Sequence, residues 1–406
     1  MSSLHQDPRF QQVVRSQLSR RALLRGAGGV GVAAALAACG TGDDETGTTA
    51  KPKATVKDKS ATEKVVRWAN WPFYIDEAEE GGKTVYPTLE KFQEATGIEV
   101  NYAADIDDND SYYAKIQGQL KNGDDIGKDV VVFTDWMAGR MIRQGYVQKL
   151  DKGNIPNAAN LNAKLQDVDF DPGREHSLTW QSGYAGIGYR KDKVGKELVS
   201  LQDLWAPELK GKVVVLSEMR DTVGLIMLSQ GVDISGDFTE DDFMAALDEL
   251  QKHVDSGQIR QVKGNSYVED LRSGNAIASI GWSGDILLAQ FEEEDPNYTF
   301  ALPEEGGTLW SDNLMVPIAS PHKANAEKLF DFYYDPVIAA EVAAYVNYIC
   351  PVDGAKEEME KLDPSLADSP LIFPTEEDLA KVKVFRALSP DEEITFNEAF
   401  QQVIGN

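Results

Sequence analysis

Aromatic and acidic side chains recur at the ends of the apolar runs that are expected to form strands. Trp71 and Tyr74 follow the first run, and Thr134 and Trp136 follow the third. Similar side chains stand at the ends of later runs, at Glu218, Asp221, Trp282 and Asp285, and Trp310 and Asp312 precede the last run. Aromatic faces cover methylene groups and attract cations, and carboxylates form charge-assisted hydrogen bonds with ammonium groups. Brought together, these residues would suit a small organic cation.

The elements that must position these residues alternate along almost the whole chain. The expected strands are 64–69, 98–102, 129–133, 186–189, 212–216, 277–282, 298–302 and 314–318. Several are nearly continuous apolar runs, which is typical of parallel strands buried on both faces. The expected helices include 112–121, 136–144 and 243–254, the last opened by a capping box of Thr239 and Asp242.

Alternating strands and helices predict an α/β fold in which mixed sheets are flanked by helices. The chain has 406 residues, which is too long for one simple core and sufficient for two lobes. In open α/β sheets, ligands bind in the crevice beyond the carboxyl ends of the strands. The position of the aromatic and acidic residues at strand ends therefore predicts a ligand crevice there.

The net charge of −27 at pH 7 limits the partners of this chain. Nucleic acid and anionic lipid surfaces repel such a protein, whereas cationic ligands are weakly attracted. Cys39 and Cys350 are the only cysteines, so a cysteine-based metal cluster is excluded. We expect no metal and no cofactor.

The sequence offers little for catalysis. His176, His253 and His322 lie far apart, and neither a His-Glu-x-x-His nor a Gly-x-Ser-x-Gly motif occurs. Paired carboxylates are abundant, but an acidic chain contains them by chance. We therefore expect a binding protein, with a secreted enzyme as the alternative from another class.

The N-terminal residues predict export and anchoring. Arg20 and Arg21 precede the uncharged run 26–38, which is shorter than the roughly 20 residues that span a bilayer. The pair resembles a twin-arginine signal, and Leu-Ala-Ala-Cys ending at Cys39 resembles a lipobox. We expect 1–38 to be a signal, Cys39 to carry lipid, and 39–62 to be a flexible tether. The domain would then be held at the outer face of the cytoplasmic membrane, on the cell surface or in a periplasm.

Three segments together resemble the polyamine-binding proteins of ABC transporters, the spermidine/putrescine class. They are Trp-Ala-Asn-Trp at 68–71, Asp-Leu-Trp at 203–205 followed by Lys-Gly at 210–211, and Glu-Gly-Gly-Thr-Leu-Trp-Ser-Asp at 305–312. The resemblance implies a type II periplasmic-binding-protein fold, with strands crossing between two lobes near residues 180–184 and 310–314. It implies 63–180 with 312–355 as lobe 1, and 181–311 with 356–406 as lobe 2. It also implies a monomer that delivers its ligand to a membrane permease.

Carried over residue by residue, the family's aromatic box falls on Trp71, Tyr74, Trp136, Trp282, Trp310 and Tyr348. Its acidic positions fall on Glu218, Asp221, Asp285 and Asp312, and Thr134 stands where the family usually has serine. Phe73 departs from the family, because that position is often acidic. The presence of Phe73 at this position, together with Asp285, favours a putrescine-like diamine over spermidine. A betaine or other amine, ferric ion and a sugar stay open as ligands of the same fold, and adjacent Tyr333 and Tyr334 are the residues that could hint at iron.

Overall fold

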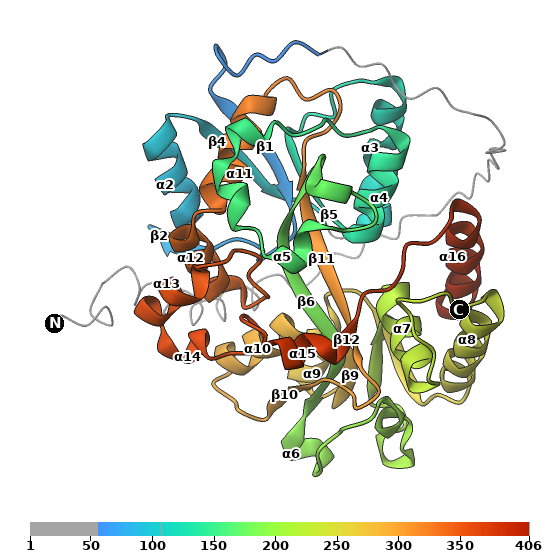
Figure 1. Cartoon of the computed structure of the whole chain (residues 1–406). Helices are drawn as coiled ribbons and strands as arrows, with labels where there is room; N and C mark the ends of the chain where they lie inside the picture. Colours follow the sequence, from blue (N-terminus) through green and yellow to red (C-terminus); the bar gives the residue numbers. More distant parts are fainter. Residues whose placement is uncertain (1–55, 107, 406) are drawn as a thin grey trace.

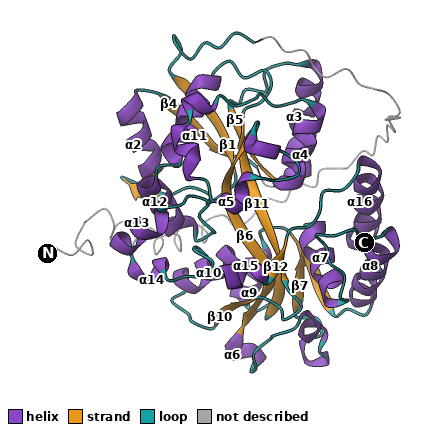
Figure 2. Ribbon diagram, in the orientation of Figure 1, coloured by secondary structure: helices purple, strands orange, loops and turns teal. Residues whose placement is uncertain are grey.

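One sheet of ten strands runs through the part of the chain that the structure describes (Figure 1, Figure 2). This computed structural model describes residues 56–106 and 108–405. Eight strands lie side by side in the order β4 (Glu99–Ala104), β1 (Val65–Asn70), β5 (Val130–Thr134), β11 (Gly307–Met315), β6 (Ser177–Arg190), β9 (Ala278–Trp282), β7 (Val213–Leu216) and β8 (Ile259–Lys263). β10 (Tyr298–Ala301) pairs with β6, and β12 (Val382–Lys383) pairs with β11. A separate hairpin consists of β2 (Ala78–Glu80) and β3 (Lys83–Val85).

The strand directions explain why a crevice forms in the middle of the molecule. β4, β1 and β5 are parallel, and so are β9, β7 and β8. Between these two sets, β11 and β6 are antiparallel to each other and to their outer neighbours, β5 and β9. The two parallel sets therefore run in opposite directions, and their carboxyl ends face each other across the β6/β11 pair.

Helices cover both faces of the sheet in Figure 2, as the alternating pattern predicts. The longer helices are α2 (Pro87–Thr96), α3 (Asn109–Asn122), α4 (Asp135–Gln144), α7 (Met219–Ser229), α8 (Glu240–Asp255), α10 (Ser283–Glu292), α11 (Lys323–Tyr333), α12 (Pro336–Val346) and α16 (Pro390–Ile404). The shorter ones are α5 (Ala163–Gln166), α6 (Lys191–Val194), α9 (Tyr267–Ser273), α13 (Ala355–Leu362), α14 (Pro364–Ala367) and α15 (Glu376–Ala380). The expected capping box is present in α8, where Thr239 and Asp242 bond reciprocally.

The sequence located most strands to within one or two residues but missed the length of the central pair. β6 has 14 residues, all buried except Arg190. The apolar pattern alone predicted only 186–189, although the resemblance implied strands crossing near 180–184 and 310–314. The Gly, Ser and Gln residues of β6 do not form an apolar run, so periodicity could not detect it. β11 begins at Gly307 and not at 314 for the same reason. β8 was missed because its central residues are exposed and polar at the sheet edge.

Buried apolar residues pack into separate clusters, which divide the molecule into an upper half and a lower half, as oriented in Figure 1. The upper half contains β4, β1 and β5 with α2 to α4 and α11 to α14. The lower half contains β9, β7 and β8 with α7 to α10 and α16. The expected boundary at residue 355 differs from this packing. Met359, Ala367 and Ile372 are buried with Val66 in the upper half, because α13 packs on α12. Phe385 is in the lower half, so the chain changes halves after residue 373.

The segment after residue 55 is bonded to the upper half. The Asp58 carboxylate accepts the backbone N–H of Ala324 at 3.0 Å, and Ser60 Oγ accepts that of Asn325 at 3.1 Å. Both donors belong to the first turn of α11, where N–H groups have no partner within the helix. The expected tether therefore extends too far along the chain. The expected signal and Cys39 lie outside the described residues, and no helix within 56–106 and 108–405 is long and apolar enough to cross a membrane.

Candidate ligand-binding crevice

A cavity of about 710 Å³ lies where the carboxyl ends of the two parallel strand sets face each other. That volume is within the range of small-molecule sites. All eleven residues selected from the sequence line this one cavity: Trp71, Tyr74, Thr134, Trp136, Glu218, Asp221, Trp282, Asp285, Trp310, Asp312 and Tyr348. Their contact with a ligand stays a prediction, but their convergence is a property of the fold.

The register of the central strands sets the width of the crevice. Thr134 ends β5 and pairs with Asp312, which pairs in turn with Gln181 of β6. Trp282 ends β9 and pairs with Ala185 of β6. Gln181 and Ala185 are about 13 Å apart along a strand at the usual rise per residue. This spacing separates the two strand ends by roughly the length of a small extended molecule.

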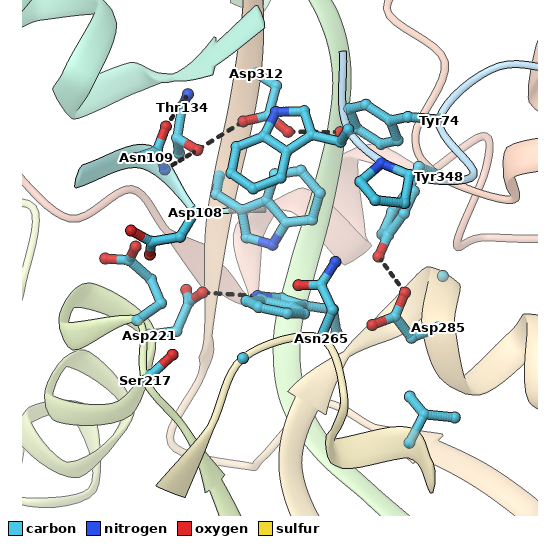
Figure 3. Close-up of a pocket in the computed structure, with 18 of the residues that line it drawn as sticks. Tyr74, Asp108, Asn109, Thr134, Ser217, Asp221, Asn265, Asp285, Asp312 and Tyr348 are labelled. Atoms are coloured by element: carbon cyan, nitrogen blue, oxygen red, sulfur yellow. Dashed lines mark hydrogen bonds between the residues drawn. The ribbon is translucent and has the colours of Figure 1, made fainter. Parts of the chain in front are cut away.

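Asp312 is buried on the upper side of the crevice and is held by two hydroxyl groups (Figure 3). Tyr74 donates to one carboxylate oxygen and Thr134 to the other, both at 2.7 Å. Burial raises the pKa of Asp312 to about 7, although these two hydrogen bonds lower it. Both of its described donors are neutral, so the charged form of Asp312 is left without full compensation.

A second carboxylate, Asp221, stands on α7 at the lower side. The indole N–H of Trp282 donates to it at 2.8 Å, and the hydroxyl of Thr308 donates at 2.6 Å. Burial raises its pKa. The bond to Asp221 fixes the orientation of the Trp282 ring, so this aromatic face and this carboxylate are positioned as a unit.

The third carboxylate, Asp285, accepts the hydroxyl of Tyr348 at 2.9 Å, and burial raises its pKa to about 6. Tyr348 packs edge-on against Trp310, with ring centroids 5.1 Å apart. Glycines make room for these rings. A Cβ at Gly183 would lie 2.5 Å from Trp310, and one at Gly284 would lie 2.6 Å from Tyr348.

The acidic side chains enter the crevice from the first turns of helices. Glu218 is the N-cap residue of α7, Asp221 lies in its first turn, and Asp285 lies in the first turn of α10. Helix N-termini carry a partial positive charge that stabilises nearby carboxylates. The fold can therefore hold these groups out of water at a lower cost than isolated burial would impose.

Trp136 and Glu218 differ from the other predicted ligand contacts, because arginines of the protein already face them. The guanidinium groups of Arg220 and Arg140 lie 4.2 and 5.1 Å from the centroid of the Trp136 ring. Arg220 also lies 3.8 Å from Glu218, whose pKa is raised to about 7 by burial. We therefore expect Trp136 and Glu218 to contribute less to ligand binding than the sequence suggested.

Sequence reasoning missed Asn109, which supports Asp312 from a distance. Its side-chain amide donates to the hydroxyl oxygen of Thr134 at 2.9 Å, and its own oxygen accepts the Thr134 N–H at 3.2 Å. Thr134 is thereby aligned to donate to Asp312 (Figure 3). An asparagine in the loop between an expected strand and an expected helix gives no signal of this role.

Other chemistries find little support at this site. Within 56–106 and 108–405, no three His, Cys, Asp or Glu side chains are placed to hold a metal ion. Tyr333 and Tyr334, the pair that could have indicated iron, are both buried. Tyr333 stacks edge-on against Trp180, with centroids 5.0 Å apart, so it belongs to the core of the upper half and not to an iron site.

A two-half α/β fold with a ligand-sized crevice at facing strand ends defines a solute-binding protein of the type II periplasmic class. Residues 88–374 match the family described as bacterial extracellular solute-binding protein, and the chain belongs to this family.

Similar proteins refine this placement. The spermidine/putrescine-binding periplasmic protein of Escherichia coli is 29% identical over 291 residues, which cover 71% of this chain and 80% of that protein. The putrescine-binding periplasmic protein SpuD of Pseudomonas aeruginosa is 27% identical over 350 residues, covering 80% and 88%. A solved structure from Listeria monocytogenes, assigned to a spermidine/putrescine ABC transporter, has a TM-score of 0.72 and 26% identity, and covers 84% of this chain and 99% of its own. The predicted resemblance to polyamine-binding proteins is confirmed.

We predict that Asp312→Asn stabilises the ligand-free protein increasingly as the pH rises. The carboxyl is protonated in the folded protein up to about pH 7, whereas in the unfolded chain it ionises near its ordinary pKa of 3.8. Its stabilising contribution is therefore complete at low pH and is lost as the pH rises to 7. Chemical denaturation should show the variant gaining on the order of 2–4 kcal/mol over the wild type between pH 4 and 8.

Asp241→Asn is the matched control, because Asp241 is exposed in the first turn of α8. Its curve should stay parallel to that of the wild type. A parallel curve for Asp312→Asn as well would show that the Asp312 carboxyl is already ionised in the ligand-free fold.

Proposed function

We propose that this protein captures a short diamine such as putrescine outside the cytoplasmic membrane and delivers it to the permease of an ABC transporter. The observation that carries the proposal is that three carboxylates on opposite sides of an aromatic crevice accept hydrogen bonds only from uncharged described donors. The described donors to Asp312, Asp221 and Asp285 are hydroxyl and indole groups, which carry no charge. An ammonium at each end of a ligand would supply the missing charge.

The aromatic lining supports a methylene chain between those ends. Trp71, Trp282, Trp310, Tyr74 and Tyr348 present ring surface to the cavity. Contacts between a partly desolvated cation and such rings contribute about 0.5–2 kcal/mol each. The relatives named for spermidine and putrescine, or for putrescine alone, support the same class of ligand here.

Phe73 supports a short diamine over a triamine. It lines the cavity and is 52% exposed, and its φ of 57° lies in the left-handed region that a bulky residue rarely adopts. The backbone thus holds an apolar ring at a place where the resemblance implies a carboxylate. A third ammonium at this end of the crevice would have no charged partner in Phe73.

Other ligands of the same fold fit less well. A betaine carries a single cationic group and would leave carboxylates on one side unpaired. A sugar would not compensate three buried carboxylates whose pKa values are raised. Ferric ion would require a ligand cluster that the described residues do not form.

We propose two lobes, the upper formed by residues 58–180 and 312–373 and the lower by 181–311 and 374–405, which close over the ligand. We further propose a monomer that binds without chemical change and is anchored through lipid at Cys39 after removal of a twin-arginine signal. Mass spectrometry of the membrane fraction would show whether Cys39 is the acylated N-terminus.

A thermal-shift panel tests the ligand class. We expect putrescine to raise the unfolding temperature most, followed by cadaverine or agmatine, because these molecules place cationic groups at two ends of a short chain. Stabilisation follows the logarithm of ligand concentration over Kd, about 2.7 kcal/mol at one hundred times Kd. A shift with ferric ion, betaine or maltose and none with any amine would refute the proposal.

We predict that Asp312→Asn and Trp282→Ala each weaken diamine binding at least about tenfold. The first removes an ion pair and the second removes a cation–π contact together with the donor that orients Asp221. Titration calorimetry measures both. Asp241→Asn and Trp205→Ala are matched controls, since Trp205 stacks on His253 and does not line the crevice. Full affinity in both site variants would place the ligand elsewhere.

Phe73→Glu should shift the preference towards longer polyamines. The new carboxylate would stand at the edge of the crevice and pair with a third ammonium. We expect the ratio of spermidine to putrescine affinity to rise about tenfold, measured by competition calorimetry. Phe73→Gln is the control for loss of the ring without a charge. An equal change in both variants would mean that the ring, and not the missing charge, sets the preference.

A further inference from the structure

Glu393 lies outside the crevice lining, near the beginning of the last helix, yet its carboxylate is surrounded by arginines. α16 belongs to the lower half, where Phe396 stacks on Phe243 of α8 with ring centroids 3.9 Å apart and planes inclined by 4°. Figure 1 shows α16 beside α8. The Glu393 side chain is only 7% exposed, so its charge must be compensated by protein groups.

The partners of Glu393 come from both halves of the molecule. Arg140 and Arg143 of α4, in the upper half, each place a guanidinium nitrogen 3.2 Å from its carboxylate. Arg220 of α7, in the lower half, does so at 3.4 Å. One buried carboxylate therefore ties α4 to α7 and α16 across the gap between the halves.

Two of these arginines also contact Trp136, a residue that lines the crevice. Arg220 and Arg140 lie over the Trp136 ring, with their guanidinium carbons 4.2 and 5.1 Å from its centroid. Trp136 lines the cavity. Glu393 thus holds two cations from opposite halves against one tryptophan of the ligand site. Without that carboxylate, the neighbouring guanidinium groups would repel one another, and breaking a buried pair leaves uncompensated charge.

We infer that Glu393 is a positioning residue that clasps the two halves shut over the crevice by pairing with Arg140 and Arg143 from the upper half and Arg220 from the lower. Separation of the halves would carry α4 away from α16 and break the pairs to Arg140 and Arg143. The pair to Arg220 would persist, because α7 and α16 share the apolar core of the lower half. The clasp favours the closed arrangement before ligand arrives and slows the release of bound ligand.

The effect on ligand release rests on the proposed diamine function, whereas the effect on the shape of the ligand-free protein does not. Glu393→Gln keeps the size of the side chain and removes its charge. We expect small-angle scattering of the ligand-free variant to give a larger radius of gyration than the wild type, returning towards the wild-type value with saturating putrescine. Stopped-flow tryptophan fluorescence should show putrescine leaving about tenfold faster, with the association rate changed much less.

Glu398→Gln is the matched control, because Glu398 is exposed on the same helix. Its scattering and release rate should equal those of the wild type. Glu393→Asp should recover part of the effect, since it restores the charge. Arg143→Gln provides a second route if Glu393→Gln does not fold: Arg143 is 42% exposed, so its loss opens one arm of the clasp without burying a new charge.

The experiments distinguish failure of the Glu393 clasp from failure of the proposed diamine function. Ligand-free scattering of Glu393→Gln, or of Arg143→Gln in its place, that matches the wild type would overturn the clasp. If no amine binds the wild type, the proposed function fails, and the scattering comparison still decides the clasp. A larger radius of gyration with an unchanged putrescine release rate would confine the role of Glu393 to the ligand-free shape and overturn its role in retention.

Discussion

β6 and β11 lie antiparallel at the centre of the sheet, and every other strand of that sheet joins one of them directly or through neighbours. This pairing fixes the distance between Thr134 at the end of β5 and Trp282 at the end of β9. It also places Asp312 beside Thr134 and Trp310 beside Gly183. Four of the predicted ligand contacts, Thr134, Trp282, Trp310 and Asp312, are therefore positioned by backbone pairing of strands.

The electrostatics of the crevice follow from that arrangement. Carboxylates on opposite sides are removed from water, which raises their pKa values, while hydroxyl and indole donors hold them in orientation. Helix N-termini at α7 and α10 make this burial tolerable. Under the proposed function, a diamine would supply the positive charge that these neutral donors lack and would favour the ionised carboxylates. Stability of the empty protein and affinity for the ligand are thus opposed, as is common at functional sites.

The sequence was sufficient to predict the strands that are buried on both faces and the residues that line the crevice, for a physical reason. Strands such as Val130–Thr134 are buried on both faces and therefore read as continuous apolar runs. In this class of fold the residue after such a run lies at the crevice, so the aromatic and acidic residues there could be selected without a structure. The central strands are buried too, but they do not form a continuous apolar run in the sequence. Aromatic rings packed against Gly183 and Gly186 leave no room for a larger side chain at these positions.

Contacts between residues far apart in the sequence could not be predicted. Asn109 acts through Thr134, and Glu393 pairs with arginines of α4 and α7, yet neither Asn109 nor Glu393 belongs to a recognisable local pattern. For the same reason, the sequence could not show which half residues 356–373 belong to. Their amphipathic helices would suit either half, and only the packing of α13 on α12 assigns them to the upper one.

The position of β11 between β5 and β6 also affects the order in which the protein folds. The hydrogen bond from Thr134 to Asp312 closes a loop of 178 residues, and that from Tyr74 closes one of 238. Closing such loops costs chain entropy before any contact repays it, and folding slows as the average separation of contacts grows. During synthesis, the upper half must wait for β11 before its sheet can be completed. The crevice is accordingly assembled late, and a chain that stops before residue 312 has no route to it.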